Sequence, residues 1–294
     1  MTPPVSCSPA RSAVFRRGLA RAILLVPLFA GRSAGQEPLP LDHFNGWENW
    51  PLLEPGDLAI HSENLSPLRI EFDGLFPGPN GFGVPPLDSL TMYIEVMEER
   101  FHGAPALWVQ WTSKPRAASG GAPALDVLLV DRASFRLLFR IAASGRGDWA
   151  GRYEVIQARP EGVVQVSVAE DGASTKQVLE GAANYFDFAT YQFLFPFLEL
   201  REGMAFRLSG YEYLEKQAEV LPVRVVGRTN VADAHGADQA VWRVDVMPPH
   251  RATLISFYVS DEPPYFYGWD YRLTRDGSTA LKLTLRGWAS TSDE

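Results

Sequence analysis

The sequence predicts an all-β protein: an antiparallel, strongly curved sheet or half-open barrel with one short aromatic helix. Three observations support this fold class. Short apolar segments with alternating side chains recur from Leu68 almost to the C-terminus, with turn residues between them. Alternation with a period of two is typical of strands that bury one face. Only one segment has the composition of a buried helix, and the 259 residues that follow residue 35 are enough for one large β domain or two small ones.

The first 35 residues have the pattern of a secretory signal peptide. Arginines at positions 11, 16, 17 and 21 precede an apolar stretch from Ala22 to Ala30, and small residues follow at positions 33–35. This pattern predicts cleavage near Gly35-Gln36 and a periplasmic or secreted protein. The apolar stretch is too short to cross a bilayer of roughly 30 Å, so no membrane span is expected. Arg16-Arg17 resembles a twin-arginine signal, but residues 18–20 fit that motif poorly, and the export route stays open.

Charge and cysteine content exclude several classes of function. Removing residues 1–35 takes away five arginines and no acidic residue, which changes the formal charge from −8 to −13. Such a charge repels phosphate backbones, so no nucleic-acid partner is expected. The single cysteine, Cys7, leaves with the signal. The mature chain therefore has no disulfide and must rely on its apolar core.

The organisation expected along the chain is simple. Residues 1–35 form the signal peptide, and residues 36–57 form a Pro-rich N-terminal extension with Trp47 and Trp50. Residues 58–290 form a single β domain, and residues 291–294 form a C-terminal tail. The sequence leaves the oligomeric state open.

About 11–13 strands are expected, an ordinary number for a barrel or sandwich. The strand patterns lie at or near Leu68, Leu90, Leu107, Val127, 135–141, Tyr153, 164–168, Phe206, Val223, 242–246, 253–259, 265–273 and 281–285. In the fifth of these, Phe135, Leu137, Phe139 and Ile141 are expected on one face, opposite Arg136 and Arg140. In the most aromatic row, Trp269 is expected to face the interior between Tyr267 and Tyr271, with Asp270 on the opposite face.

The clearest helical segment runs from Asn184 to Phe195, and Pro196 is expected to end or kink it. Its aromatic side chains point in every direction around the helix. A helix that is apolar all round is buried or covers an apolar opening. The sequence leaves open whether this helix is a plug in the core of the sheet or a lid over a ligand cavity.

Several segments together resemble a known family. They are Asp126–Phe135, Phe186–Phe188, Phe195–Gly203, Val223–Gly227, Val241–Asp245 and Tyr258–Tyr265. Their strand and turn spacing resembles an uncharacterised family of exported bacterial β-rich proteins, a domain of unknown function, over roughly residues 105–288. The resemblance carries no catalytic residue and implies no established activity. In strand count and central helix it is similar to the periplasmic carriers and receptors of lipoproteins, whose half-open barrel holds acyl chains on an apolar concave face.

The sequence contains no pattern for catalysis or metal binding. The five histidines are scattered singly, and no serine lies in a Gly-x-Ser-x-Gly motif. The adjacent acids Glu98-Glu99 and Asp261-Glu262 would point to opposite faces of a strand or into solvent, which argues against a cooperating pair. We therefore expect no metal, no cofactor and no enzymatic activity.

The function that the sequence favours is binding or carrying a hydrophobic ligand, such as a lipid or an acyl chain, on the concave face. The candidate ligand-binding residues are Phe188, Tyr191, Phe195, Trp242, Tyr265, Tyr267, Trp269 and Tyr271. One alternative is a structural or partner-binding module of the cell envelope with a filled interior. A second alternative is a carbohydrate-active hydrolase that uses two carboxylates in an aromatic cleft.

Overall fold

The computed structural model describes residues 41–57, 60–76, 88–115, 124–144, 152–159, 162–180, 184–212, 217–233, 235–249, 252–274 and 277–291. All of them belong to the unit Gln36–Glu294, one of the two units into which the chain divides. The predicted signal peptide, the start of the Pro-rich extension and the last three residues of the predicted tail lie outside these ranges.

The described residues form fifteen strands in one sheet. The first eight strands are β1 (Leu52–Leu53), β2 (Leu68–Phe76), β3 (Asp88–Phe101), β4 (Ala104–Pro115), β5 (Ala124–Asp131), β6 (Leu137–Ser144), β7 (Arg152–Arg159) and β8 (Gly162–Val168). The others are β9 (Ser174–Glu180), β10 (Ala205–Glu212), β11 (Gln217–Ala232), β12 (Asp238–Val246), β13 (Thr253–Val259), β14 (Phe266–Leu273) and β15 (Thr279–Ser290). The predicted fold class is confirmed.

Two of these strands have no counterpart in the prediction. The two-residue strand β1 lies in the Pro-rich extension and pairs in parallel with β10. Strand β9 has the sequence Ser-Thr-Lys-Gln-Val-Leu-Glu, which is too polar to show an alternating apolar pattern. Both are end strands, where one side of the backbone pairs with the sheet and little burial is required.

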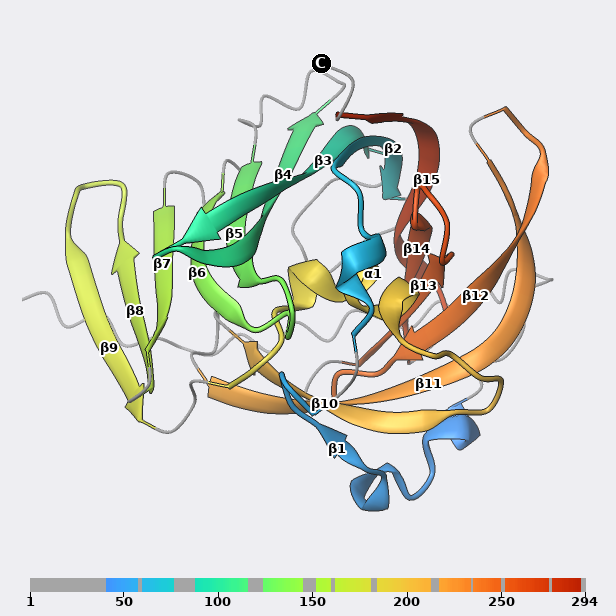
Figure 1. Cartoon of the computed structure of the whole chain (residues 1–294), viewed down its shortest axis with the longest axis horizontal. Helices are drawn as coiled ribbons and strands as arrows, with labels where there is room; N and C mark the ends of the chain where they lie inside the picture. Colours follow the sequence, from blue (N-terminus) through green and yellow to red (C-terminus); the bar gives the residue numbers. More distant parts are fainter. Residues whose placement is uncertain are drawn as a thin grey trace, which may run out of the picture. The chain divides into compact units, whose positions relative to one another are not determined.

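The sheet consists of two antiparallel meanders. They are joined because the last strand, β15, pairs with β2 near the start of the domain. Strands β2 to β9 follow one another in the sheet, as do β10 to β15, and β15 pairs with β2. Strands β1 and β9 stand at opposite ends of this order, so the sheet is not closed into a barrel. Figure 1 shows the sheet curving around the helical residues between β9 and β10.

Helical structure between β9 and β10 consists of three consecutive short pieces. They are the 3-10 turn η5 (Phe188–Thr190), the single α-helical turn α1 (Tyr191–Leu194) and the 3-10 turn η6 (Phe195–Phe197). We call Phe188–Phe197 the helical segment. It starts four residues later than predicted, because the Asp187 side chain accepts a hydrogen bond from the Ala189 N–H at 2.9 Å and caps its start. Pro196 lies near the start of η6, where a missing N–H is tolerated.

Other helical residues lie in the N-terminal part of the domain. These are the 3-10 turns η1 (Leu41–Phe44), η2 (Trp47–Asn49) and η3 (Ser62–Asn64). Phe44 is buried and its ring lies 5.9 Å from that of Trp50. The Arg207 side chain donates a hydrogen bond to the Trp50 carbonyl at 2.8 Å, which ties this region to β10.

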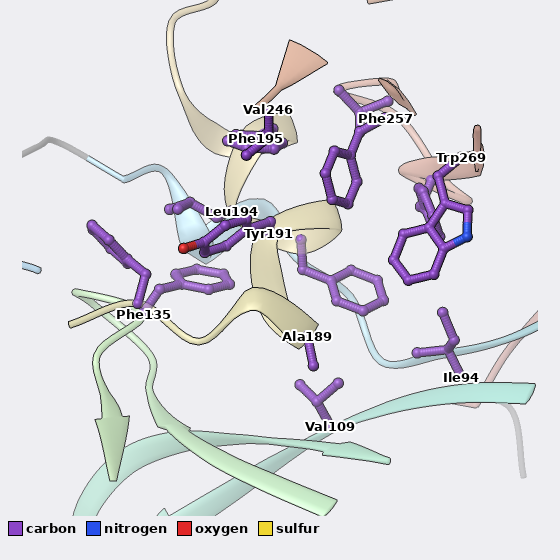
Figure 2. Packing of buried hydrophobic residues seen from close by; sticks show 14 of the residues in the cluster. Ile94, Val109, Phe135, Ala189, Tyr191, Leu194, Phe195, Val246, Phe257 and Trp269 are labelled. Atoms are coloured by element: carbon purple, nitrogen blue, oxygen red, sulfur yellow. The ribbon is translucent and has the colours of Figure 1, made fainter. Parts of the chain in front are cut away.

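The core lies between the concave face of the sheet and the helical segment. Figure 2 shows Ala189 above Val109, Tyr191 and Leu194 near the centre, and Phe257 and Trp269 to the right of them. The Trp111 indole N–H donates a hydrogen bond to the Ala189 carbonyl at 3.0 Å. Tyr191, Leu194 and Phe195 have no exposed surface. The segment therefore fills the concave side as part of the core.

Two β-bulges change predicted side-chain directions, which alternation within a single strand cannot reveal. A register shift at Leu129/Val130 places Phe139 on the face opposite Leu137, and Arg140 points toward the core. A shift at Tyr258/Val259 brings Phe266 into the core and leaves Tyr267 only partly buried. Asp270 lies on the face opposite Trp269, as predicted, and its carboxylate accepts a hydrogen bond from the Tyr258 hydroxyl at 2.9 Å.

Truncation of Trp269 tests the packing of the helical segment. The Trp269 ring stacks on Trp111 at 5.6 Å and lies 5.8 Å from Phe188. We expect Trp269→Ala to lower the free energy of unfolding by about 3–5 kcal/mol in urea denaturation. Lys282→Ala, an exposed position on the neighbouring strand β15, is the matched control and should change it by less than about 0.5 kcal/mol. A similar loss in both variants would contradict this packing.

Candidate functional site

The aromatic residues selected from the sequence fall into two groups. Phe188, Tyr191, Phe195, Trp269 and Tyr271 belong to one continuous core cluster beneath and within the helical segment. Their meeting point is Phe257 on β13, whose ring lies 5.8 Å from Phe188, 5.4 Å from Phe195 and 5.7 Å from Trp269. Phe257 was not among the candidates, although its place in the alternating row 253–259 gave the signal. The structure brings this group together as packed core.

Of the other three selected residues, Tyr265 is buried in the same core cluster, whereas Trp242 and Tyr267 are partly buried against it. The Tyr265 hydroxyl donates a hydrogen bond to the Asn64 carbonyl at 2.8 Å, and its ring lies 5.1 Å from Phe197. The Arg228 guanidinium lies 4.3 Å from the centre of the Trp242 ring, a cation–π contact. Tyr267 packs partly buried beside the bulge in β14. Tyr265 thus contacts the C-terminal end of the helical segment, and Trp242 contacts the neighbouring strand β11.

A charged triad fixes the start of the helical segment. Arg140 on β6 donates to both carboxylate oxygens of Asp187, at 3.1 and 2.9 Å, and to Asp126 on β5. Arg140 and Asp187 are almost completely buried. We call Asp126, Arg140 and Asp187 the charged triad. A buried guanidinium of this kind requires both carboxylates, because an unpaired buried charge is strongly destabilising.

A second polar network continues along the same face of the sheet. The Tyr211 hydroxyl donates to the Gln165 side-chain carbonyl at 2.5 Å, and the Gln165 amide donates to Glu154 at 2.8 Å. The Ser167 hydroxyl also donates to Glu154, at 2.6 Å. The inner face of β5–β8 is therefore unusually polar where it meets the residues that precede the helical segment.

The opposite face of β5–β9 is apolar. Strand register aligns three rows of side chains across these five strands, and twelve of the fifteen positions are apolar. We call the twelve the outer apolar face: Leu125, Val127, Leu129, Phe139, Ile141, Ala143, Tyr153, Val155, Val164, Val166, Val168 and Val178. None of them belongs to the main core cluster. Leu125, Tyr153 and Val178 are 39%, 52% and 50% exposed, whereas Val127, Leu129 and Val164 in the same face are buried. Large exposed apolar side chains on one sheet face are uncommon.

Glu219 on β11 lies near the helical segment and has a perturbed acidity. Burial raises its pKa from 4.5 to about 7, and the negative charge of Asp187 acts in the same direction. Gly210 on β10 makes room for it, since a Cβ there would lie 3.2 Å from Glu219 Cγ and 3.3 Å from the Tyr191 hydroxyl oxygen. That hydroxyl has no hydrogen-bond partner among the described residues.

Neither acidic pair named in the sequence analysis is buried, since Glu98, Glu99, Asp261 and Glu262 are exposed. The described residues contain no group of three or more His, Cys, Asp or Glu side chains that could hold an ion. Glu98 accepts a hydrogen bond from Arg132 at 2.5 Å. A cavity of about 180 Å³ lies beside Phe197, lined also by His61, Asn64, Leu198 and Asp261, and it is smaller than typical ligand pockets of ~300–1,000 Å³. In the part of the chain that the structure describes, no helix is long and apolar enough to cross a membrane.

Removing Asp187 tests the charged triad. Asp187→Ala leaves Arg140 with one carboxylate and removes the cap of η5, so we expect the free energy of unfolding to fall by about 3–5 kcal/mol. Glu199→Ala removes an exposed ion pair with Arg201, 3.3 Å apart, and should cost less than about 1 kcal/mol. Both values come from urea denaturation at neutral pH. Equal values would mean that the triad does not stabilise the domain.

The raised pKa of Glu219 predicts a pH dependence of stability. Between about pH 4.5 and pH 7 the folded state binds the carboxyl proton more tightly than the unfolded state, so stability falls as pH rises through this window. Glu219→Gln should remove this fall and stabilise the domain by about 1–3 kcal/mol at pH 8, with little effect at pH 4.5. Urea denaturation of both proteins at the two pH values measures this. An equal effect of the substitution at both values would contradict it.

Comparisons with known proteins agree with this architecture. Residues 140–268 match the family model described as protein of unknown function (DUF3108). No curated protein matches the sequence. The β-barrel-like protein of domain of unknown function DUF1849 from Brucella abortus has a similar fold, with 10% identity, a TM-score of 0.51, and coverage of 77% of this chain and 98% of that chain.

A protein with a YmcC-like fold from Bacteroides fragilis covers 82% of this chain and 98% of its own, with 11% identity and a TM-score of 0.33. At these identities the likeness to DUF1849 concerns the fold alone, and the second likeness adds no argument. As the resemblance in the sequence implies, the chain is similar to uncharacterised β-rich proteins of unknown function, through the DUF3108 model over residues 140–268 and through its fold over most of its length.

Proposed function

We propose that this protein is a non-enzymatic binding protein of the periplasm or the extracellular space, and that its ligand is the acyl chain of a lipid. We place the ligand on the outer apolar face of β5–β9. The observation that carries this proposal is the alignment of twelve apolar side chains in three rows, several of them exposed to solvent. An antiparallel sheet with one solvated face normally shows polar residues there.

The composition of the outer apolar face favours an acyl chain over a protein partner. Seven of its twelve residues are Val or Ile, with only Phe139 and Tyr153 aromatic. Protein interfaces are instead enriched in aromatic residues, Met and Arg, and their hot spots are poor in Val and Leu. An acyl chain needs no hydrogen-bond partner, and each methylene group that leaves water contributes about 0.8 kcal/mol. Five strands at a spacing of about 4.8 Å give a surface roughly 19 Å wide, enough for a long chain.

This placement differs from the concave site favoured by the sequence. The concave face is filled by the helical segment, whose Tyr191, Leu194 and Phe195 have no exposed surface. A ligand could enter there only if the segment moved outward. One observation favours such a lid: Tyr191 Oη and Gln192 Oε1 are buried without a hydrogen-bond partner among the described residues, which lowers the stability of the closed state. The lid is therefore the second candidate.

A titration with an environment-sensitive fatty-acid probe separates the two sites. We expect saturable binding that unlabelled fatty acid displaces. Val155 lies in the middle row of the outer apolar face between Ile141 and Val166. Val155→Asp should weaken binding at least tenfold, about 1.4 kcal/mol. Val231→Asp on the β11–β12 hairpin, another partly exposed strand position, is the matched control and should leave affinity unchanged.

The other outcomes assign the site elsewhere. If Phe188→Asp weakens binding in a folded variant and Val155→Asp does not, the lid over the concave face is the site. If the wild-type protein shows no saturable uptake, both lipid sites are eliminated and a structural module with a filled interior takes their place. Circular dichroism of each variant establishes that it is folded.

A further inference from the structure

The helical segment is joined to the rest of the domain by few polar contacts. Apart from bonds to its flanking residues, the Ala189 carbonyl accepts a hydrogen bond from the Trp111 indole at 3.0 Å. The Phe197 carbonyl accepts one from the His61 backbone N–H at 3.1 Å. Between these two points, the Tyr191 hydroxyl is buried without a hydrogen-bond partner among the described residues, which weakens the state that buries it. The closed position of the segment therefore depends mainly on aromatic packing.

Glu219 on β11 meets the segment at this hydroxyl group. Glu219 and Tyr191 converge over Gly210, since a Cβ atom there would contact both side chains. Burial, together with the negative charges of Glu219 and Asp187, raises the pKa of Tyr191 well above its ordinary value of 10. Glu219 itself is partly buried and has no ion-pair partner among the described residues.

The groups that face Glu219 from the neighbouring elements do not compensate its charge. Asp187, directly before the segment, is an acid and adds to the effect of burial in raising the pKa of Glu219. Arg140 is already shared by Asp187 and Asp126. Strand β10 pairs Gly210 with Glu219 and so offers no side chain. A carboxylate at this position therefore has another carboxylate near it and gains stability when it reaches solvent.

From this cluster we infer that the helical segment is a lid that is controlled by a proton. A protonated Glu219 keeps the segment closed on the concave face, and an ionised Glu219 favours an open state in which the sheet remains folded. The closed state holds the carboxyl proton up to about pH 7, whereas an open state that exposes Glu219 releases it near pH 4.5. The open fraction therefore rises with pH between these two values and levels off above them.

Hydrogen–deuterium exchange read by mass spectrometry tests this inference. The peptide containing Phe188–Phe197 is compared with the core strand β13 in the wild type and in Glu219→Gln. The two proteins are compared at the same pH, so the pH dependence of intrinsic exchange cancels. We expect the segment to be less protected than β13. Glu219→Gln should slow exchange of the segment at least about tenfold at pH 8 and about twofold or less at pH 4.5.

The matched control is Glu199→Gln, which changes an exposed carboxylate two residues after the segment. It should leave the exchange of the segment unchanged at both pH values. Glu219→Met, which is uncharged at every pH, repeats the test with a second side chain of similar length. Circular dichroism at both pH values establishes that each variant is folded.

Two results would overturn the inference. Equal protection of the segment and β13 would mean that the segment opens only when the whole sheet unfolds. An effect of the Glu219 substitutions that is absent at pH 8, or equal at both pH values, would mean that the proton does not control opening. The inference does not depend on the proposed acyl ligand of the outer apolar face, because exchange is measured without lipid. Its failure would leave that proposal intact.

Discussion

Everything else in this fold depends on how an open sheet buries its concave face. A fifteen-stranded sheet whose end strands do not meet has no interior of its own, so another part of the chain must cover the apolar side chains. The helical segment does this with aromatic residues that point in every direction, centred on contacts with Phe257. Because three short helical turns satisfy few backbone groups by themselves, the segment also needs Asp187 as a cap and the Ala189 carbonyl as an acceptor for Trp111.

The charged triad has a consequence on the other side of the sheet. Strand side chains alternate, so a strand that turns Arg140 toward the core turns Phe139 and Ile141 away from it. The same holds on β8, where Gln165 is buried inside and Val164 and Val166 lie on the outer face. The polarity of β5–β8 is thus partly inverted relative to the rest of the sheet. The apolar outer face accompanies the polar anchoring of the helical segment.

The fold class and most strands follow from the sequence because alternation is a local property of each segment. The helical segment is also predictable, since its aromatic composition requires burial in the core or a place over an apolar opening, although the sequence does not choose between these two. The directions in which particular side chains point are harder to predict from the sequence. Phe266 replaces Tyr267 in the core because of a bulge, which depends on the pairing of β13 with β14 rather than on β14 alone. Arg140 faces inward because Asp126 and Asp187 receive it, and these partners are 14 and 47 residues away.

The candidate site is even harder to predict from the sequence than the side-chain directions. A search for aromatic residues finds the core, because large apolar side chains that are buried against each other look identical in sequence to those that line a cavity. The outer apolar face becomes visible only when the direction of Arg140 is known, since until then its valines are assigned to the interior. An exposed face of this kind favours unspecific association, which the formal charge of −8 opposes. The proposed acyl ligand would cover the exposed part of this face, at Leu125, Tyr153 and Val178.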